Sequence, residues 1–96
     1  SACLVGSEMC IRDSTKALAR EVAPSGVRVN SVAPGPTVTA MLTEMTNEYT
    51  EETRHTIPAQ RFGTPEDIAR TVAFLAGPGG DYFVGQVLSP NGGAVI

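Results

Sequence analysis

The sequence has 96 residues, a formal net charge of -3, and acidic and basic residues spread along its length. A chain of this size can form one small domain, but it is too short for a complete dinucleotide-binding fold with its two βαβαβ halves. It shows no basic stripe, no bilayer-spanning apolar run and no signal-peptide pattern, so we expect a soluble, cytoplasmic protein without nucleic-acid or membrane partners. Cys3 and Cys10 match no metal-binding spacing, so no metal site is expected.

The first residues fit poorly with the segment after them. Residues 1–13 show neither a helical nor a strand period, yet they adjoin a far more regular segment. Residues 3–14, Cys-Leu-Val-Gly-Ser-Glu-Met-Cys-Ile-Arg-Asp-Ser, resemble a translated sequencing-adapter remnant. We therefore expect residues 1–14 to be a non-native leader, and the alternative is a genuine but irregular start of a helix.

A helix and a strand come after the leader. The segment from Ser14 to Ala23 predicts a helix, because Ser14 can cap its start and its apolar residues share one stripe. Pro24 ends this helix. Residues 27–32 are rich in valine and predict a covered strand, which the Pro-Gly-Pro turn at residues 34–36 stops abruptly.

The segment after this strand is the candidate site. Thr37 and Thr39 have a spacing of two, so their hydroxyls share one face of an extended segment at the carboxyl end of the strand, where open α/β sheets bind ligands. The alternative is a turn that only ends the strand. Residues 41–45 carry two methionines that suit a lid over the site or a cover for the sheet. Residues 47–56 are polar, and His55 has no evident acid or nucleophile nearby, so a catalytic role is not expected.

The second half predicts another helix and strand. Thr64 is an N-cap, Pro65 occupies the first helical position, and a broad apolar face extends to about Ala76. Glycines and a proline at residues 77–80 end the helix. Residues 84–88 then predict a second strand, parallel to the first.

This order of elements predicts an α/β fold with a parallel sheet. Two parallel strands cannot form a stable sheet alone, because a parallel sheet needs both faces covered and further strands beside it. We therefore expect residues 27–32 to present an unpaired edge and both helices to lack partners for their apolar faces. The chain is then part of a larger domain.

Three stretches, in this order, resemble the C-terminal portion of a classical short-chain dehydrogenase/reductase. They are Thr-Lys-Ala-Leu-Ala-Arg-Glu-Val-Ala-Pro-Ser-Gly-Val-Arg-Val-Asn-Ser-Val-Ala-Pro-Gly at 15–35, Arg-Phe-Gly-Thr-Pro-Glu-Asp-Ile-Ala at 61–69, and Gly-Gln-Val-Leu-Ser-Pro-Asn-Gly-Gly at 85–93. The resemblance implies that residues 15–96 are the C-terminal part of a single doubly wound, parallel-sheet Rossmann-type domain. It also implies two parallel strands and about three to four helices.

The resemblance also implies a function. The family transfers hydride between NAD or NADP and an alcohol or ketone carbon, and its Pro-Gly segment contacts the nicotinamide end of the cofactor. This role carries over to Pro34, Gly35, Thr37 and Thr39. The ending at residues 85–93 is nearest to the 3-oxoacyl carrier-protein reductase type. This implies a small-molecule carbonyl substrate, such as a 3-oxoacyl thioester. It also implies that the full-length parent enzyme is a homodimer or homotetramer.

The family's catalytic groups are missing from the sequence. Its Tyr-x-x-x-Lys pair would fall on Leu4 and Glu8, the only lysine is Lys16, and the glycine-rich phosphate loop belongs to an absent N-terminal half. We predict no catalytic residue here and an inactive 96-residue chain, because hydride transfer needs an acid to protonate the alkoxide. The alternatives are a non-catalytic binding or oligomerisation module derived from this family, and a genuine minimal enzyme.

Overall fold

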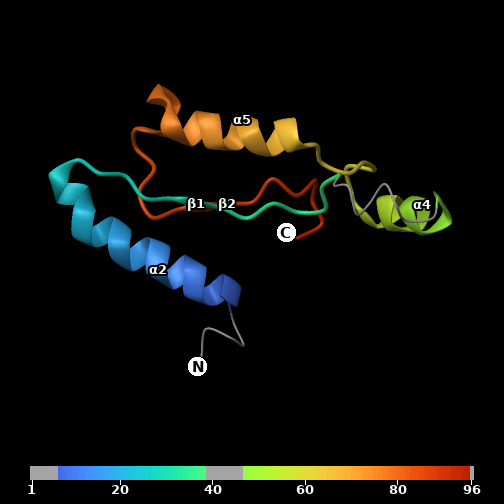
Figure 1. The fold of residues 1–96 in the computed structure, drawn as a ribbon, viewed down its shortest axis with the longest axis horizontal. Coiled ribbons are helices and arrows are strands. Elements are labelled where there is room, and N and C mark those ends of the chain that lie inside the picture. Colours follow the sequence, from blue (N-terminus) through green and yellow to red (C-terminus); the bar gives the residue numbers. More distant parts are fainter. Residues whose placement is uncertain (1–6, 39–46, 96) are drawn as a thin grey trace.

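The computed structural model describes residues 7–38 and 47–95. In chain order its elements are α2 (Ser7–Val22), the 3-10 turn η1 (Ala23–Ser25), β1 (Ser31–Val32), α4 (Asn47–Thr56), α5 (Pro65–Ala76), the 3-10 turn η2 (Pro78–Gly80) and β2 (Val87–Leu88). The two strands run side by side, α5 lies along one side of them and α2 along the other (Figure 1). The helix α4 lies beyond the end at which β1 leads into the Pro-Gly turn (Figure 1).

The two strands are parallel, which confirms the α/β prediction. Ser31 pairs with Val87 and Val32 with Leu88. Backbone bonds in the same register continue past β1, from the Ala33 N–H to the Leu88 carbonyl at 2.9 Å and from the Gly35 N–H to the Pro90 carbonyl at 3.2 Å. Within the described residues β1 has β2 as its one strand neighbour, so its other edge is unpaired, as expected.

Both strands are shorter than the predicted ranges 27–32 and 84–88, and Asn30 bridges the two segments just before the strands begin. Its side-chain Nδ2 donates to the Phe83 carbonyl, and its Oδ1 accepts the Gln86 N–H, each at 2.9 Å. These side-chain bonds lie beside one backbone bond, from the Gly85 N–H to the Val29 carbonyl at 2.9 Å. The segments are still held together there, but regular strand pairing begins only at Ser31.

The first helix begins at Ser7, seven residues before the predicted start at Ser14. Ser14 is therefore an exposed residue inside α2 and not its cap. Residues 7–13 contain neither glycine nor proline, so nothing in their backbone chemistry stops the helix from extending toward the N-terminus. The helix buries Thr15 and Ala19, which lie one turn apart, whereas Leu18, predicted on the apolar stripe, is 47% exposed.

The last helix agrees closely with its sequence signals. The Thr64 side chain accepts the Asp67 N–H at 3.2 Å, and the Asp67 carboxylate accepts the Thr64 N–H at 2.9 Å, so the two residues form a capping box. Pro65 is the first residue of α5 and Ala76 is the last, as predicted. The Gly77 N–H closes the end by donating to the Ala73 carbonyl at 2.9 Å.

The core within the described chain is small. Ala19 and Ile57 are its only fully buried hydrophobic residues among those that the structure describes. On α5, Val72 and Phe74 are about half exposed, at 50% and 46%. The apolar face predicted for this helix is therefore present in the sequence but is left largely uncovered by residues 7–38 and 47–95.

Candidate functional site

The Pro-Gly turn comes directly after β1 and packs against the C-terminal turn. The Gly35 N–H donates to the Pro90 carbonyl at 3.2 Å. A methyl group at Gly35 would lie 2.4 Å from the Asn91 Cβ and 2.6 Å from its Cα. Only glycine therefore allows these two turns to approach, while Pro34 beside it stays exposed.

Thr37 joins this turn to the start of α5. Its Oγ1 donates to the Gly35 carbonyl at 2.8 Å, and its backbone forms a parallel bridge with Gly63. Two further bonds close the same junction, from the Gly63 N–H to the Pro36 carbonyl at 2.9 Å and from the Val38 N–H to the Gly63 carbonyl at 2.8 Å. Because the Thr37 hydroxyl donates its proton to Gly35, its oxygen is left as an acceptor toward a ligand.

The structure thus brings three of the four predicted site residues together. Pro34, Gly35 and Thr37 share one short segment at the carboxyl end of β1. Thr39 and residues 41–45, the predicted lid or sheet cover, lie outside the described residues. The polar residues 47–56 after them form α4.

Two cavities adjoin the turn. One, of about 190 Å³, lies between α2 and β1 and reaches Pro34; it is lined by Ile11, Arg12, Ser31, Val32, Ala33, Pro34 and Val87. The other, of about 200 Å³, is lined by Pro36, Ala59, Arg61, Gly63, Asp67, Pro90, Asn91 and Gly92. In the first cavity the Ser31 Oγ is buried and finds no hydrogen-bond partner within the described chain. A polar ligand group or a further segment of protein would satisfy it.

An ion pair supports the second cavity. The Arg61 guanidinium lies 2.8 Å from the Asp67 carboxylate. The hydrogen bond from Arg61, followed by the one from the Thr64 N–H, holds the pKa of Asp67 well below its usual range. The same contact raises the pKa of Arg61. These shifts keep both groups charged, so the pair acts as a structural brace and not as a proton donor.

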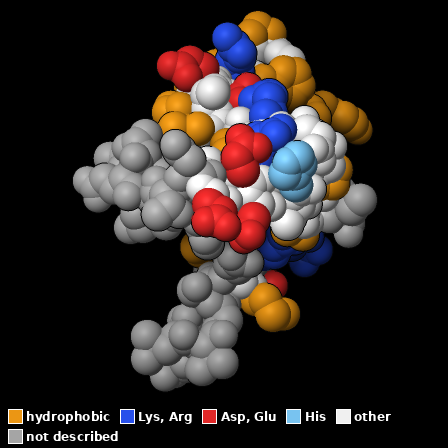
Figure 2. Space-filling model, turned by 90° about the vertical axis from the view of Figure 1, so that its right-hand side faces the viewer, with side chains coloured by type: hydrophobic (Ala, Val, Ile, Leu, Met, Phe, Trp, Pro, Cys, Tyr) orange, Lys and Arg blue, Asp and Glu red, His pale blue; other side chains and the backbone are white. Residues whose placement is uncertain are grey.

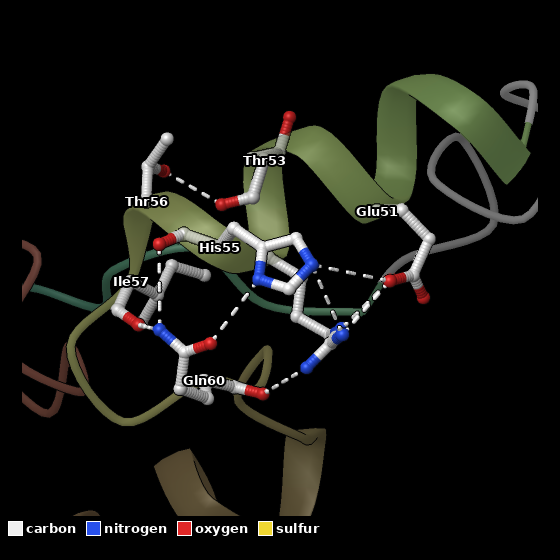
Figure 3. A network of polar contacts seen from close by, with 7 residues as sticks. Glu51, Thr53, His55, Thr56, Ile57 and Gln60 are labelled. Atoms are coloured by element: carbon white, nitrogen blue, oxygen red, sulfur yellow. Dashed lines mark hydrogen bonds and ion pairs between the residues drawn. The ribbon is translucent and has the colours of Figure 1, made fainter.

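The end of α4 carries a polar network, drawn in Figure 3. Arg54 pairs with Glu51 at 2.8 Å and donates to the Gln60 carbonyl at 3.0 Å. The bond and charge of Arg54 lower the pKa of Glu51. Gln60 has a positive φ of 61°, and its side-chain amide donates to the carbonyls of Ile57 and His55 at the end of the helix. The network therefore closes the C-terminus of α4.

His55 belongs to this network, which corrects one expectation from the sequence. Glu51, one helical turn earlier, places its carboxylate 3.7 Å from the His55 Nε2, and the Gln60 Oε1 lies 3.3 Å from Nδ1. The spacing of four residues could have shown this acid. Acidic and basic side chains mix on the molecular face at the α4 end (Figure 2), so the histidine sits in a solvated surface cluster rather than in a catalytic pocket.

The side chain that organises the C-terminal turn was not singled out from the sequence. The Asn91 Nδ2 donates to the Val95 carbonyl at 2.9 Å and to the Ser89 Oγ at 2.8 Å, and its Oδ1 accepts the Gly93 N–H at 2.8 Å. Ser89 in turn donates to the Ala33 carbonyl at 2.8 Å. The Pro-Asn-Gly-Gly pattern was a signal for a turn, but its contact with Gly35 is not visible in one sequence.

Neither a metal-binding cluster nor a membrane-spanning helix is present among the described residues. They contain no cluster of three or more His, Cys, Asp or Glu side chains that could hold a metal ion. None of the described helices is long and apolar enough to cross a membrane. At the turn, Pro34 supplies an exposed ring and Thr37 supplies a hydroxyl acceptor.

Comparison with known proteins places this geometry in a family. Residues 6–95 match the family model described as Enoyl-(Acyl carrier protein) reductase. The chain is 47% identical over 78 residues to an uncharacterized oxidoreductase, YmfI, of Bacillus subtilis, covering 81% of this chain and 32% of the relative. It is 48% identical over 79 residues to the 3-oxoacyl-[acyl-carrier-protein] reductase FabG of Vibrio cholerae, covering 82% and 32%. The FabG of Rickettsia bellii is 45% identical over 82 residues, covering 85% and 34%. The chain spans about a third of the length of these relatives.

Proposed function

The chain belongs to the short-chain dehydrogenase/reductase family, and on that premise we propose that it is the C-terminal third of an NAD(P)-dependent oxidoreductase. The whole enzyme would transfer hydride between nicotinamide and an alcohol or ketone carbon. The observation that carries the proposal is the turn formed by Pro34, Gly35 and Thr37 at the carboxyl end of β1, where an open α/β sheet binds its ligand. The match to oxidoreductases over four fifths of the chain supports it.

In this proposal Pro34, Gly35, Thr37 and Thr39 contact the nicotinamide end of NAD or NADP. The cofactor would supply the hydride. Thr37 would accept a hydrogen bond from the cofactor, because its own proton is held by the Gly35 carbonyl. Gly35 would let this turn lie directly against Asn91, because it has no side chain.

The substrate class is inferred from the relatives and from α4. Two of them are named as 3-oxoacyl-[acyl-carrier-protein] reductases, so we propose a 3-oxoacyl thioester as the carbonyl substrate. The helix α4 would be the described part of the lid above it. The whole enzyme would be a cytoplasmic homodimer or homotetramer.

The acid that protonates the alkoxide would lie outside this chain, so the 96 residues alone would be inactive. Residues 15–96 would form the C-terminal portion of one Rossmann-type domain, and residues 1–14 would be a non-native leader. A single genomic read across the codons before Ser14 tests this division. A continuous frame with Tyr-x-x-x-Lys supports it, and a confirmed genomic leader contradicts it.

A chimera tests the proposed function. Residues 15–96 replace the matching C-terminal part of the Vibrio cholerae relative, and oxidation of NAD(P)H is monitored with a 3-oxoacyl thioester. Thr37→Val removes the hydroxyl and is expected to raise the KM for NAD(P)H about tenfold. Thr71→Val is the matched control, because the Thr71 hydroxyl bonds only along α5, to the Asp67 carbonyl at 3.1 Å. Equal cofactor KM values for both variants would contradict the role of Thr37.

A non-catalytic oligomerisation module remains the second candidate. The observation that favours it is the exposure of apolar side chains on two helices, with Leu18 on α2 at 47% and Val72 on α5 at 50%. Sedimentation of the 96-residue chain distinguishes the two proposals. A discrete folded oligomer favours the module, and heterogeneous aggregates favour an incomplete enzyme domain.

A further inference from the structure

The C-terminal turn, residues 89–95, is closed by a single side chain. The amide of Asn91 forms three hydrogen bonds of 2.8 to 2.9 Å, two as donor and one as acceptor. The acceptor bond, from the Gly93 N–H to Oδ1, spans Gly92 and Gly93, whose φ angles are 64° and 93°. Asn91 therefore fixes a turn that its glycines would otherwise leave free to move.

One side of this turn contacts the turn formed by Pro34, Gly35 and Thr37, which we call the nicotinamide turn after its proposed role. Pro90 accepts the Gly35 N–H at 3.2 Å, and the Ser89 hydroxyl donates to the Ala33 carbonyl at 2.8 Å. The Cβ and the backbone of Asn91 fill the space where a Gly35 side chain would be. A displacement of Asn91 therefore removes or tightens the contact that holds Gly35.

The other side of the turn supports the base of α4. The Gly92 carbonyl accepts the Ala59 N–H at 2.9 Å. A Cβ built on Gly92 would lie 3.0 Å from the Ile57 Cγ2, and one built on Gly93 would lie 3.0 Å from the Pro58 Cβ. Ile57, the residue directly after α4, is 1% exposed, so the end of this proposed lid helix packs on the glycine backbone of the turn.

We propose that Asn91 is a positioning residue that couples the nicotinamide turn to the base of the lid helix. It acts through its Oδ1 bond to Gly93, which holds one turn against Gly35 on one side and Ile57 on the other. The inference rests on the proposed function and deepens it. Because hydride transfer depends on the relative placement of two bound molecules, a small shift at this turn alters the binding of both cofactor and carbonyl substrate.

The kinetic test uses the chimera and three variants. Asn91→Ala removes all three bonds, and we expect the KM for NAD(P)H and the KM for the 3-oxoacyl thioester each to rise about tenfold. Asn91→Asp keeps the acceptor for the Gly93 N–H and is expected to restore both KM values toward those of the unmodified chimera. Asn30→Ala is the matched control, because this asparagine also bonds two backbone groups of the strand pair, but before β1 and away from the turn.

The outcomes separate positioning from folding. General destabilisation lowers the active fraction and hence kcat, and it leaves both KM values unchanged, as expected for Asn30→Ala. If Asn91→Ala changes the KM values no more than Asn30→Ala does, the inference is overturned. If Asn91→Asp is as impaired as Asn91→Ala, the Oδ1 bond is not the coupling contact and the inference is likewise overturned.

Hydrogen exchange tests the coupling without activity. In the chimera, peptides covering residues 33–38 and 57–62 report the Gly35 and Ala59 N–H groups, which donate to Pro90 and Gly92. We expect both peptides to exchange slowly, Asn91→Ala to accelerate both, and Asn91→Asp to retain protection. Fast exchange before mutation, or acceleration of one peptide alone, overturns the inference. An inactive chimera with coupled exchange contradicts the proposed function and supports the coupling.

Discussion

Adding a single methyl group at Gly35 tests the packing that organises the site. The Cβ of Gly35→Ala would lie 2.4 Å from the Asn91 Cβ and 3.3 Å from its carbonyl oxygen. Carbon atoms normally pack at about 3.5 to 4.0 Å, so the two turns must separate by roughly an ångström or more. The φ of Gly35 is not in the left-handed region, so the obstacle is lack of space and not backbone conformation.

The cost has two contributions. Overpacking against a backbone that cannot rotate away costs about 1 to 3 kcal/mol. Loss of the bond from the Gly35 N–H to Pro90 adds about 1 kcal/mol. In a chimera of the relatives' length, a loss of about 2 to 4 kcal/mol lowers Tm by roughly 4 to 16 °C.

Gly63→Ala is the matched control. Its Cβ would meet its nearest atom, the Pro36 carbonyl oxygen, at 3.5 Å, which is an ordinary contact. Both variants add one methyl group close to Thr37, so they differ chiefly in available space. Thermal unfolding of the two chimeras side by side measures the difference. Equal Tm values, or a larger loss for Gly63→Ala, would refute the close packing of the two turns.

Three further outcomes are expected. The lowered pKa of Asp67 means that its carboxylate stabilises the fold above its ordinary pKa of 3.8 and loses this effect as the pH falls. Asp67→Asn should therefore flatten the dependence of the urea midpoint on pH below about 5, and an unchanged slope would contradict the ion pair with Arg61. Asn30→Ala should destabilise the chimera by about 1 to 2 kcal/mol in urea unfolding, because two backbone groups lose their partner; no change would show that the bonds are not formed. The 96-residue chain should aggregate, because β1 has a free edge and α5 an uncovered face; a cooperative unfolding transition from a soluble monomer would refute this.

The parts of the fold set by neighbouring residues were predictable from the sequence. Thr64, Pro65 and Asp67 lie within one helical turn, and their caps and charges define the start of α5 whatever surrounds it. The Pro-Gly turn at residues 34–36 follows β1 as predicted, although the Gly35 N–H still donates to the Pro90 carbonyl at 3.2 Å. The parallel pairing could be inferred from the order of these elements.

Other features depend on contacts that are distant in sequence. Asn30 meets Phe83 and Gln86 at sequence separations of 53 and 56, and these bonds join the two segments just before the strands begin. Asn91 meets Gly35 in the same way. The early start of α2 had a different cause, because Ser14 resembled a cap although the residues before it can also form a helix.

Turnover by the chimera that carries residues 15–96 tests the central claim most directly. We predict that it oxidises NADH or NADPH in the presence of a 3-oxoacyl thioester, with Pro34, Gly35 and Thr37 forming part of the cofactor site, while the 96-residue chain alone does not. A folded chimera that binds neither cofactor nor thioester and shows no oxidation of NAD(P)H would contradict the account.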